Sequence, residues 1–270
     1  MKTFGAAVLG LSLVASCAVD AEQDLDLAET DSEITNGDLD GQAHPAVVMI
    51  LMEIDGVPRY RCSGTLLSPT VVLTAGHCTG APGEFSGMKV FADSDLRPNG
   101  LWSHPYAEAL SWRTHPDYTS AAFFLHDVGV INLATPITIT GAYPTLPAAD
   151  ALDAMAPRKS TTFTAVGYGL QQASPNPKQV MAELVRMRAQ PSLVQINTGF
   201  TGPQSLLLSN NASSGGTCFG DSGGPNFVGS TAVVGGVTSF GLNGSCGGTG
   251  GVFRVDRPDV LAFIAAASVP

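Results

Sequence analysis

The segment Gly220-Asp221-Ser222-Gly223-Gly224-Pro225 surrounds a serine hydroxyl with glycines. Glycines at these positions let the backbone turn sharply and let a substrate approach the hydroxyl closely. They also leave backbone N–H groups free to point at one spot, which is what stabilisation of an oxyanion requires. This segment predicts a serine nucleophile at Ser222.

Two further segments carry groups that can activate a serine. A serine hydroxyl is a weak nucleophile unless a base removes its proton, and histidine suits that role near neutral pH. His77 lies in Thr74-Ala75-Gly76-His77-Cys78, directly after an apolar run. Asp127 heads the apolar run that begins at Val128, where a buried carboxylate needs a partner. Taken alone, His77 is better explained as structural and Asp127 as a strand cap, so their co-occurrence with Ser222 carries the hypothesis.

The order of these residues along the chain separates two kinds of serine hydrolase. The segment Gly220 to Gly224 also matches G-x-S-x-G, the nucleophile elbow of α/β-hydrolases, in which the histidine follows the serine. Here every histidine precedes Ser222, and the sequence shows no β-α-β alternation. The α/β-hydrolase fold is therefore excluded. The histidines are His44, His77, His104, His115 and His126.

Together the three segments resemble the chymotrypsin-like (trypsin-like) serine proteases. The matching motifs are TAGHC around His77, HDVGV around Asp127 and GDSGGP around Ser222, in the family's order, and the likeness covers roughly residues 34–267. The resemblance implies a catalytic triad of His77, Asp127 and Ser222 that hydrolyses peptide bonds through an acyl-enzyme. It also implies an all-β fold of two six-stranded antiparallel Greek-key β-barrels with a C-terminal helix.

The same resemblance assigns supporting roles. The backbone N–H groups of Gly220 and Ser222 would form the oxyanion hole, and Ser239 would support the buried Asp127. Ser239, Phe240 and Gly241 would form the strand beside the substrate. The disulfide Cys62–Cys78 would hold the histidine loop, and Cys218–Cys246 would frame the specificity pocket.

Substrate preference is also inferred from the resemblance. Gly216 stands where trypsin has the aspartate of its pocket floor, and Thr217 follows it. The wall positions correspond to Gly241 and Gly251. An open, uncharged pocket suits large apolar side chains such as Phe, Tyr, Leu or Met, and placing Asp at position 216 is expected to improve cleavage after Lys or Arg.

The segment Ile34-Thr35-Asn36-Gly37 is similar to the family's N-terminus after activation, although Thr35 and Asn36 depart from its pattern. A cut between Glu33 and Ile34 would free an α-amine that pairs with buried Asp221. An unpaired Asp221 would be costly, so the uncut pocket is expected to be disordered. Because Glu33 precedes the cut, the activating protease is not expected to be trypsin-like.

The composition supports a β-rich, exported protein. Of 270 residues, 44% are hydrophobic, and Gly (31) and Pro (18) are abundant, as in folds with many turns. We expect barrel one at about 34–142, barrel two at about 159–255, a linker at Tyr143–Arg158 and a helix at 258–267, all within a protease domain at 34–270. Strands are expected at Ala46–Ile54, Val71–Ala75, Val128–Leu133, Thr161–Gly167, Ser205–Leu208, Ala232–Ser239 and Gly251–Val255.

The first 33 residues have the features of a targeting segment. Residues 1–17 contain an apolar run from Phe4 to Ser16, which is too short to span a bilayer but suits a signal peptide. The run ends in Val-Ala-Ser-Cys, which resembles a bacterial lipobox with Cys17 as the lipidated residue; the alternative is an ordinary signal peptide cut after Ala18. Residues 18–33 form an acidic propeptide that we expect to be disordered. The other four cysteines suit two disulfides in a secreted or cell-envelope protein.

Several classes of function are disfavoured. The formal charge of −10 argues against nucleic acid as a partner, because phosphate binding needs positive charge. Membrane contact is expected only through a lipid on Cys17. We expect a monomer with polypeptide substrates and an activating protease, and no cofactor. Glu84, Asp93 and Asp95 lie where some relatives bind calcium, but such loop carboxylates are more often simply solvated, so no metal is assigned. The sequons at Asn211 and Asn243 are disregarded for a bacterial protein.

Two alternatives to an active secreted endopeptidase remain open at this point. One is a non-catalytic binding module with the protease fold, and the other is an envelope protein unrelated to proteases. Loss of catalysis normally appears as loss of a triad residue, and all three are present. Labelling by a serine-directed fluorophosphonate would separate the enzyme from both alternatives.

Overall fold

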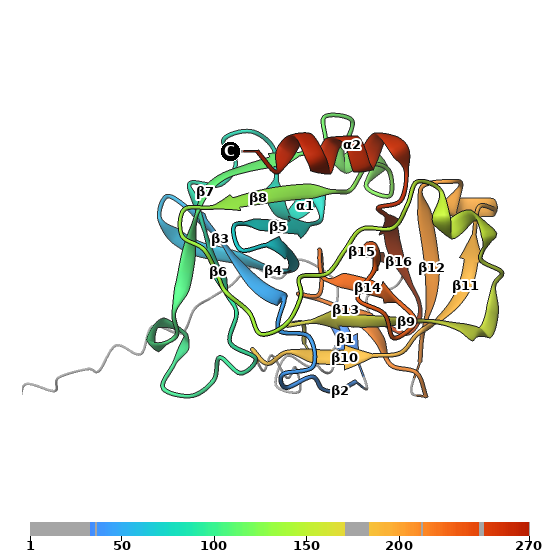
Figure 1. Ribbon diagram of the computed structural model, residues 1–270, viewed down its shortest axis with the longest axis horizontal. Helices are drawn as coiled ribbons and strands as arrows, with labels where there is room; N and C mark the ends of the chain where they lie inside the picture. The colour runs from blue at the N-terminus through green and yellow to red at the C-terminus, as the bar shows by residue number, and fades with distance from the viewer. Residues whose placement is uncertain (1–32, 36, 171–183, 212, 243–245, 270) are drawn as a thin grey trace, which may run out of the picture.

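The computed structural model describes residues 33–35, 37–170, 184–211, 213–242 and 246–269. The predictions for the signal peptide, for lipidation of Cys17 and for most of the propeptide lie outside these residues. Figure 1 shows two β-structures side by side, with the C-terminal helix lying across the top of the first. No helix within the described residues is long and apolar enough to cross a membrane.

The first barrel is a closed ring of antiparallel strands in the order β3-β4-β5-β8-β7-β6. Closure pairs each strand on both sides and leaves no edge open to other chains. The strands are β3 (Val47–Ile54), β4 (Val57–Ser68), β5 (Val71–Thr74), β6 (Gly87–Phe91), β7 (Tyr106–Thr114) and β8 (Gly129–Leu133).

The second barrel lies within an eight-stranded sheet in the order β11-β12-β16-β15-β14-β9-β10-β2. An additional pairing between β11 and β9 closes six of these strands into a ring, and β10 and β2 extend the sheet from β9. The strands are β2 (Asp38–Leu39), β9 (Arg158–Gly167), β10 (Met187–Ala189), β11 (Ser192–Ile196), β12 (Ser205–Asn210), β14 (Pro225–Val228), β15 (Val234–Gly241) and β16 (Gly248–Arg254).

The prediction of an all-β fold with two six-stranded antiparallel barrels is confirmed. Each of the seven apolar stretches singled out in the sequence overlaps a strand. Strand β3 shows why: all of its residues from Val47 to Glu53 are buried, since one face lines the barrel and the other faces neighbouring elements. One apolar cluster runs from β3 of the first barrel to Phe227 of the second, so the barrels share a core.

Helix α2 (Pro258–Ala267) joins the end of the second barrel back to the first. It begins with proline at its first turn, where the missing N–H has no helical partner to lose. Its last turn is held by the first barrel, because the side-chain amide of Asn132 in β8 donates to the Ala267 carbonyl at 2.9 Å. The predicted C-terminal helix is thus confirmed, and it fastens the two barrels together (Figure 1).

A buried ion pair beside β2 and β10 also contacts the first barrel. The Arg186 guanidinium and the Asp40 carboxylate are both fully buried, and Nε donates to Oδ2 at 3.0 Å. The remaining donors of Arg186 reach the carbonyls of Val47 and Gly41 and the hydroxyl of Tyr168. The Asp40 carboxylate also accepts the backbone N–H of His44 and contacts its ring Nδ1, so loss of Arg186 removes one of its two buried side-chain partners.

We therefore expect Arg186→Leu to lower the free energy of unfolding by about 3–5 kcal/mol, the usual effect of breaking a buried pair. Chemical denaturation measures the change. Arg188→Leu is the matched control, since Arg188 lies two residues further along and is only partly buried. Equal losses in the two variants would contradict a stabilising role for the Arg186–Asp40 pair.

Candidate active site

The three residues singled out by their motifs come from both barrels. His77 lies in the short helix α1 (Gly76–Thr79), directly after β5. Asp127 precedes β8, and both belong to the first barrel. Ser222 lies in the second barrel, in the loop between β13 (Gly216–Cys218) and β14. The site therefore exists only when the two barrels are docked.

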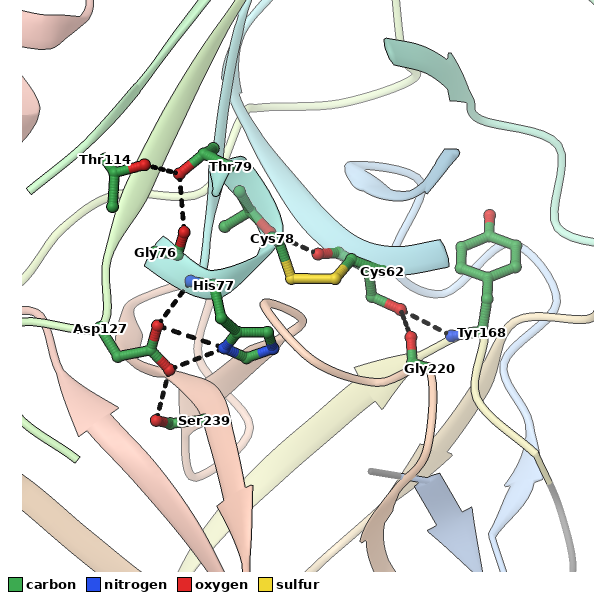
Figure 2. The surroundings of a disulfide bond; sticks show 12 residues. Cys62, Gly76, His77, Cys78, Thr79, Thr114, Asp127, Tyr168, Gly220 and Ser239 are labelled. Atoms are coloured by element: carbon green, nitrogen blue, oxygen red, sulfur yellow. Dashed lines mark hydrogen bonds and ion pairs between the residues drawn. A yellow bond between two sulfur atoms is a disulfide. The ribbon is translucent and has the colours of Figure 1, made fainter. Parts of the chain in front are cut away.

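Asp127 is the centre of a hydrogen-bond network that Figure 2 shows in full. Its carboxylate is 1% exposed and accepts the backbone N–H of His77 at 2.9 Å. The His77 ring places Nδ1 at 3.0 Å from Oδ2 and 3.2 Å from Oδ1. From the second barrel, the Ser239 hydroxyl donates to Oδ2 at 2.5 Å. The structure thus brings His77, Asp127 and Ser239 together as the resemblance implies.

This network determines the protonation of His77. Burial alone would lower the pKa of the imidazole, but the charge of Asp127 and its hydrogen bond outweigh burial and raise the pKa above its ordinary value. Because Nδ1 faces the carboxylate, the proton of the neutral ring is held there. Nε2 is then the basic nitrogen, which is the form a general base requires.

Ser222 is placed next to this network by backbone contacts. Its carbonyl accepts the N–H of Ser63 at 2.8 Å, and Ser63 follows Cys62, which is joined to Cys78 by a disulfide. The Ser222 side chain is 1% exposed, and its hydroxyl forms no hydrogen bond with His77 in this structure. Catalytic hydrogen bonds of this type are often long until substrate binds.

A glycine lets the loop of Ser222 approach the segment that leads to His77. Gly223 has φ of +78°, and a Cβ there would lie 2.0 Å from Thr74 Oγ1 and 2.7 Å from the Ala75 nitrogen. Any side chain at this position would push the serine loop away from the histidine. The glycine of the GDSGGP motif therefore serves close approach between the two barrels.

The loop before Ser222 is clamped in one orientation. The Leu170 N–H donates to the Phe219 carbonyl at 2.9 Å, and the Ser63 hydroxyl donates to the Gly220 carbonyl at 2.9 Å. A peptide unit is planar with its N–H opposite its C=O, so the Leu170 bond also fixes the direction of the Gly220 N–H. Within the described residues, the N–H groups of Gly220 and Ser222 donate to no protein acceptor. They remain available to an oxyanion.

Asp221 lies in a separate buried pocket behind this loop. Its carboxylate is fully buried and accepts the Gly169 N–H at 2.9 Å and the Cys218 N–H at 3.2 Å. Gly167 makes room for it, since a Cβ there would lie 2.1 Å from Asp221 Oδ1. Burial raises its pKa to about 8, against the opposing effects of the Gly169 hydrogen bond and the Arg61 charge.

The chain around the expected activation cut pairs with the strand that leads to Asp221. Strand β1 (Glu33–Thr35) is antiparallel to β13, with Glu33 opposite Cys218 and Thr35 opposite Gly216. Cys218 is the residue whose N–H binds the Asp221 carboxylate. The Glu33–Ile34 bond therefore lies opposite the residue that binds the Asp221 carboxylate. This is the carboxylate that the amine freed by the cut is expected to reach.

Two of the glycines expected to line the specificity pocket, Gly216 and Gly251, lie against neighbouring side chains. A Cβ at Gly216 would lie 2.2 Å from Cγ of Asn210, and a Cβ at Gly251 would lie 2.2 Å from the Phe240 ring. Each glycine therefore accommodates a neighbour and does not by itself open a space. The predicted disulfides are confirmed, including Cys218–Cys246 beside these residues.

A cavity of about 490 Å³ lies beside His77. Its lining includes the aromatic rings of Tyr60, Phe85 and Tyr118 and the carboxylate of Glu84. Burial, followed by the charges of Asp127 and Glu84, raises the pKa of Tyr118, so this phenol stays neutral. The cavity can therefore take an apolar or aromatic side chain of a bound peptide next to the histidine.

The loop carboxylates considered for calcium have protein partners. Asp93 accepts from His104 at 2.7 Å, Asp95 forms an ion pair with Arg97 at 2.7 Å, and Glu84 accepts the Ala81 N–H at 2.7 Å. A second cluster joins His115, Asp117 and His126. Its two rings are stacked 4.7 Å apart with planes 17° apart, so their in-plane lone pairs do not converge, and we assign it no metal.

Several residues of the site were not identified from the sequence. Ser63, Leu170 and the pair Gly167 and Gly169 hold the serine loop and the Asp221 carboxylate. The available signal was the spacing of the two glycines around Tyr168. Asn210 gave no signal, because only the folded hairpin places it over Gly216.

Comparisons with known proteins agree with this geometry. The Trypsin family model matches residues 36–260. Brachyurin of Leptuca pugilator is 30% identical over 198 residues, which cover 69% of this chain and 78% of that protein. A trypsin of Saccharopolyspora erythraea is 28% identical over 232 residues, which cover 85% and 92%.

Solved structures share the fold at low identity. A structure described as HL collagenase has a TM-score of 0.65 at 20% identity and covers 83% of this chain and 94% of its own. Human heparin binding protein has a TM-score of 0.65 at 20% identity, covering 86% and 96%. At this identity the likeness is evidence for the fold alone.

The pKa of Asp221 leads to a prediction for the uncut chain. A carboxyl whose folded pKa of about 8 exceeds its unfolded value near 4 favours folding below pH 4 and loses that contribution as pH rises toward 8. Uncut protein carrying Ser222→Ala should therefore unfold at a lower temperature at pH 8 than at pH 5. Adding Asp221→Asn should reduce this pH dependence. An equal pH dependence with and without Asp221→Asn would show that the buried carboxyl does not titrate in this range.

Proposed function

The chain belongs to the trypsin family and is a serine endopeptidase, and we propose that His77, Asp127 and Ser222 are its catalytic triad. The observation that carries this assignment is the buried Asp127 carboxylate, which orients His77 with Nε2 left as the free base. His77 Nε2 takes the proton of the Ser222 hydroxyl as its oxygen attacks the scissile carbonyl carbon. The same nitrogen then returns the proton to the leaving amine.

Two features would stabilise the charges that form during the reaction, which are the negative charge of the tetrahedral intermediate and the positive charge of the His77 imidazolium. Negative charge that develops on the substrate oxygen would be bound by the N–H groups of Gly220 and Ser222, which the clamped loop leaves without protein acceptors. The imidazolium formed at His77 would be stabilised by Asp127, which Ser239 keeps hydrogen-bonded on its other side. Water then attacks the acyl carbon while His77 takes its proton, and His77 returns that proton to the Ser222 oxygen as the carboxylic acid product is released.

The two alternative functions are less well supported. A non-catalytic binding module would not need the orientation of His77 by Asp127, and all three residues of the proposed triad are present. An envelope protein unrelated to proteases is inconsistent with membership of the trypsin family. Reaction of Ser222 with a fluorophosphonate distinguishes the enzyme from the binding module.

Preference for an uncharged residue before the scissile bond is the second part of the proposal. Position 216, where trypsin carries aspartate, is glycine, so no carboxylate from that position can pair with Lys or Arg. The side chains over this region are Asn210 and Phe240, which are neutral. We infer a preference for apolar residues such as Leu, Met, Phe or Tyr.

The third part concerns activation and location. The two disulfides indicate an oxidising, extracytoplasmic compartment. A cut before Ile34 would free an amine near Asp221, and an ion pair there would stabilise the charged form of a carboxylate that burial now disfavours. We further propose that the protein is a monomer and that a separate protease, one that cleaves after Glu33, activates it.

Catalysis should depend on the triad as a unit. We expect Ser222→Ala or His77→Ala to lower kcat by roughly a millionfold, with little further loss in the double variant, because each removal disables the same step. Peptide hydrolysis by protein cut at Ile34 measures this. Ser192→Ala, on the distant strand β11, is the control for loss of a serine. Retention of a tenth of the activity in Ser222→Ala would contradict the assignment.

The lipobox and the activation site lie on one short segment, which predicts a link between location and activity. If Cys17 is lipidated, residues 17–33 tether the precursor within tens of ångströms of a membrane. The cut before Ile34 would then release and activate the catalytic domain together. Cell fractions should show inactive membrane-bound protein and active soluble protein that begins at Ile34. Full activity in an uncut lipidated form would contradict this link, as would soluble active enzyme that begins before Ile34.

A further inference from the structure

In the hairpin that leads into β13, the side chain of Asn210 fills the space beside Gly216. Asn210 ends β12, the chain reverses through a bridge between Asn211 and Gly215, and Gly216 begins β13. A Cβ on Gly216 would lie 2.2 Å from Cγ, 2.4 Å from Oδ1 and 2.6 Å from Cβ of Asn210. The Asn210 carboxamide therefore occupies the volume that any side chain at position 216 would need.

Asn210 is held rigidly in this position. The side chain is 2% exposed, and its Nδ2 donates to the Thr217 carbonyl at 2.6 Å. The Thr217 hydroxyl lies against β16, since a Cβ at Gly250 would lie 2.9 Å from its Oγ1. A buried amide with a bonded N–H group is costly to displace, because its polar atoms would lose their partners.

We propose that Asn210, and not position 216, forms the floor of the subsite for the residue before the scissile bond, and that it sets both the depth and the charge preference of that subsite. The inference rests on the proposed protease function and on Gly216 lying at the base of the subsite. A fixed carboxamide shortens the subsite and presents a neutral floor. Side chains of intermediate length, such as Leu and Met, therefore fit better than Phe or Tyr.

The same contact changes what is expected of an aspartate at position 216. Its Cβ would meet both Cγ and Cβ of Asn210, so the carboxylate cannot be accommodated while Asn210 is present. Truncation of Asn210 to alanine leaves the Cβ contact at 2.6 Å, and only glycine removes it. Aspartate at 216 therefore requires a glycine at 210.

The experiment compares kcat/KM for peptides that differ only in the residue before the cut, because a ratio of two substrates does not depend on the fraction of folded enzyme. Removing part of a subsite floor changes such ratios by about 10- to 200-fold. We expect Asn210→Ala to raise the Tyr-to-Leu ratio at least tenfold. Gly216→Asp alone should lose activity without gaining cleavage after Arg, and Gly216→Asp with Asn210→Gly should raise the Arg-to-Leu ratio about a hundredfold.

Asn132→Ala is the matched control, since it also removes a buried carboxamide that donates to a carbonyl, but on β8. Its Tyr-to-Leu ratio should equal that of the wild type. The inference is overturned if Asn210→Ala leaves the ratio within twofold of wild type, or if Gly216→Asp alone cleaves after Arg. Failure of the wild type, cut at Ile34, to react with a fluorophosphonate would instead overturn the proposed function.

Discussion

A buried carboxylate at the junction of the two barrels organises this molecule. Asp127 is almost completely removed from water, and an unpaired charge in that position would be costly. Its partners come from both barrels, since His77 lies after β5 and Ser239 lies on β15. The need to satisfy one charge therefore couples the docking of the barrels to the orientation of the histidine. The α2 helix reinforces the same junction, because His126, next to Asp127, lies 3.4 Å from Asp259 of that helix.

A second buried carboxylate, that of Asp221, is under the same constraint but has different partners. Asp221 accepts two backbone N–H groups, yet burial still raises its pKa to about 8 in the uncut chain. Asp127 pairs with the imidazole of His77, whereas Asp221 accepts two backbone N–H groups and is affected by the charge of Arg61. A buried carboxylate whose charged form is disfavoured is strongly stabilised when a cation binds beside it. The need to pair a buried charge, which orients His77 at Asp127, thus also gives a physical reason for the proposed ordering of the loop before Ser222 by a free amine.

The sequence predicted the parts of this structure whose cause is local. Apolar stretches such as Val71–Thr74 must be buried wherever they lie, so their strands could be found by pattern alone. Strand β4 was missed because Arg59, Arg61 and Gly64 interrupt its apolar pattern, although it forms part of a closed ring that buries its centre. The residues of the proposed triad were singled out because three motifs fix their types and order. Leu170 and Ser63 were not found, because their roles depend on a backbone contact and a hydroxyl bond that exist only after the barrels dock.

The glycines show why the substrate preference was harder to infer than the chemistry. A glycine in a sequence reports a missing side chain, but it does not report what fills the space. At Gly223 the space is filled by Thr74, at Gly251 by the ring of Phe240 and at Gly216 by Asn210. Only the first of these glycines belongs to the motif around Ser222, and the sequence alone does not show which neighbour lies against any of the three. Chemistry can be recognised from residue types because a base and a nucleophile must be particular groups. Specificity depends on volume, and a volume is set by neighbours that are distant in the sequence.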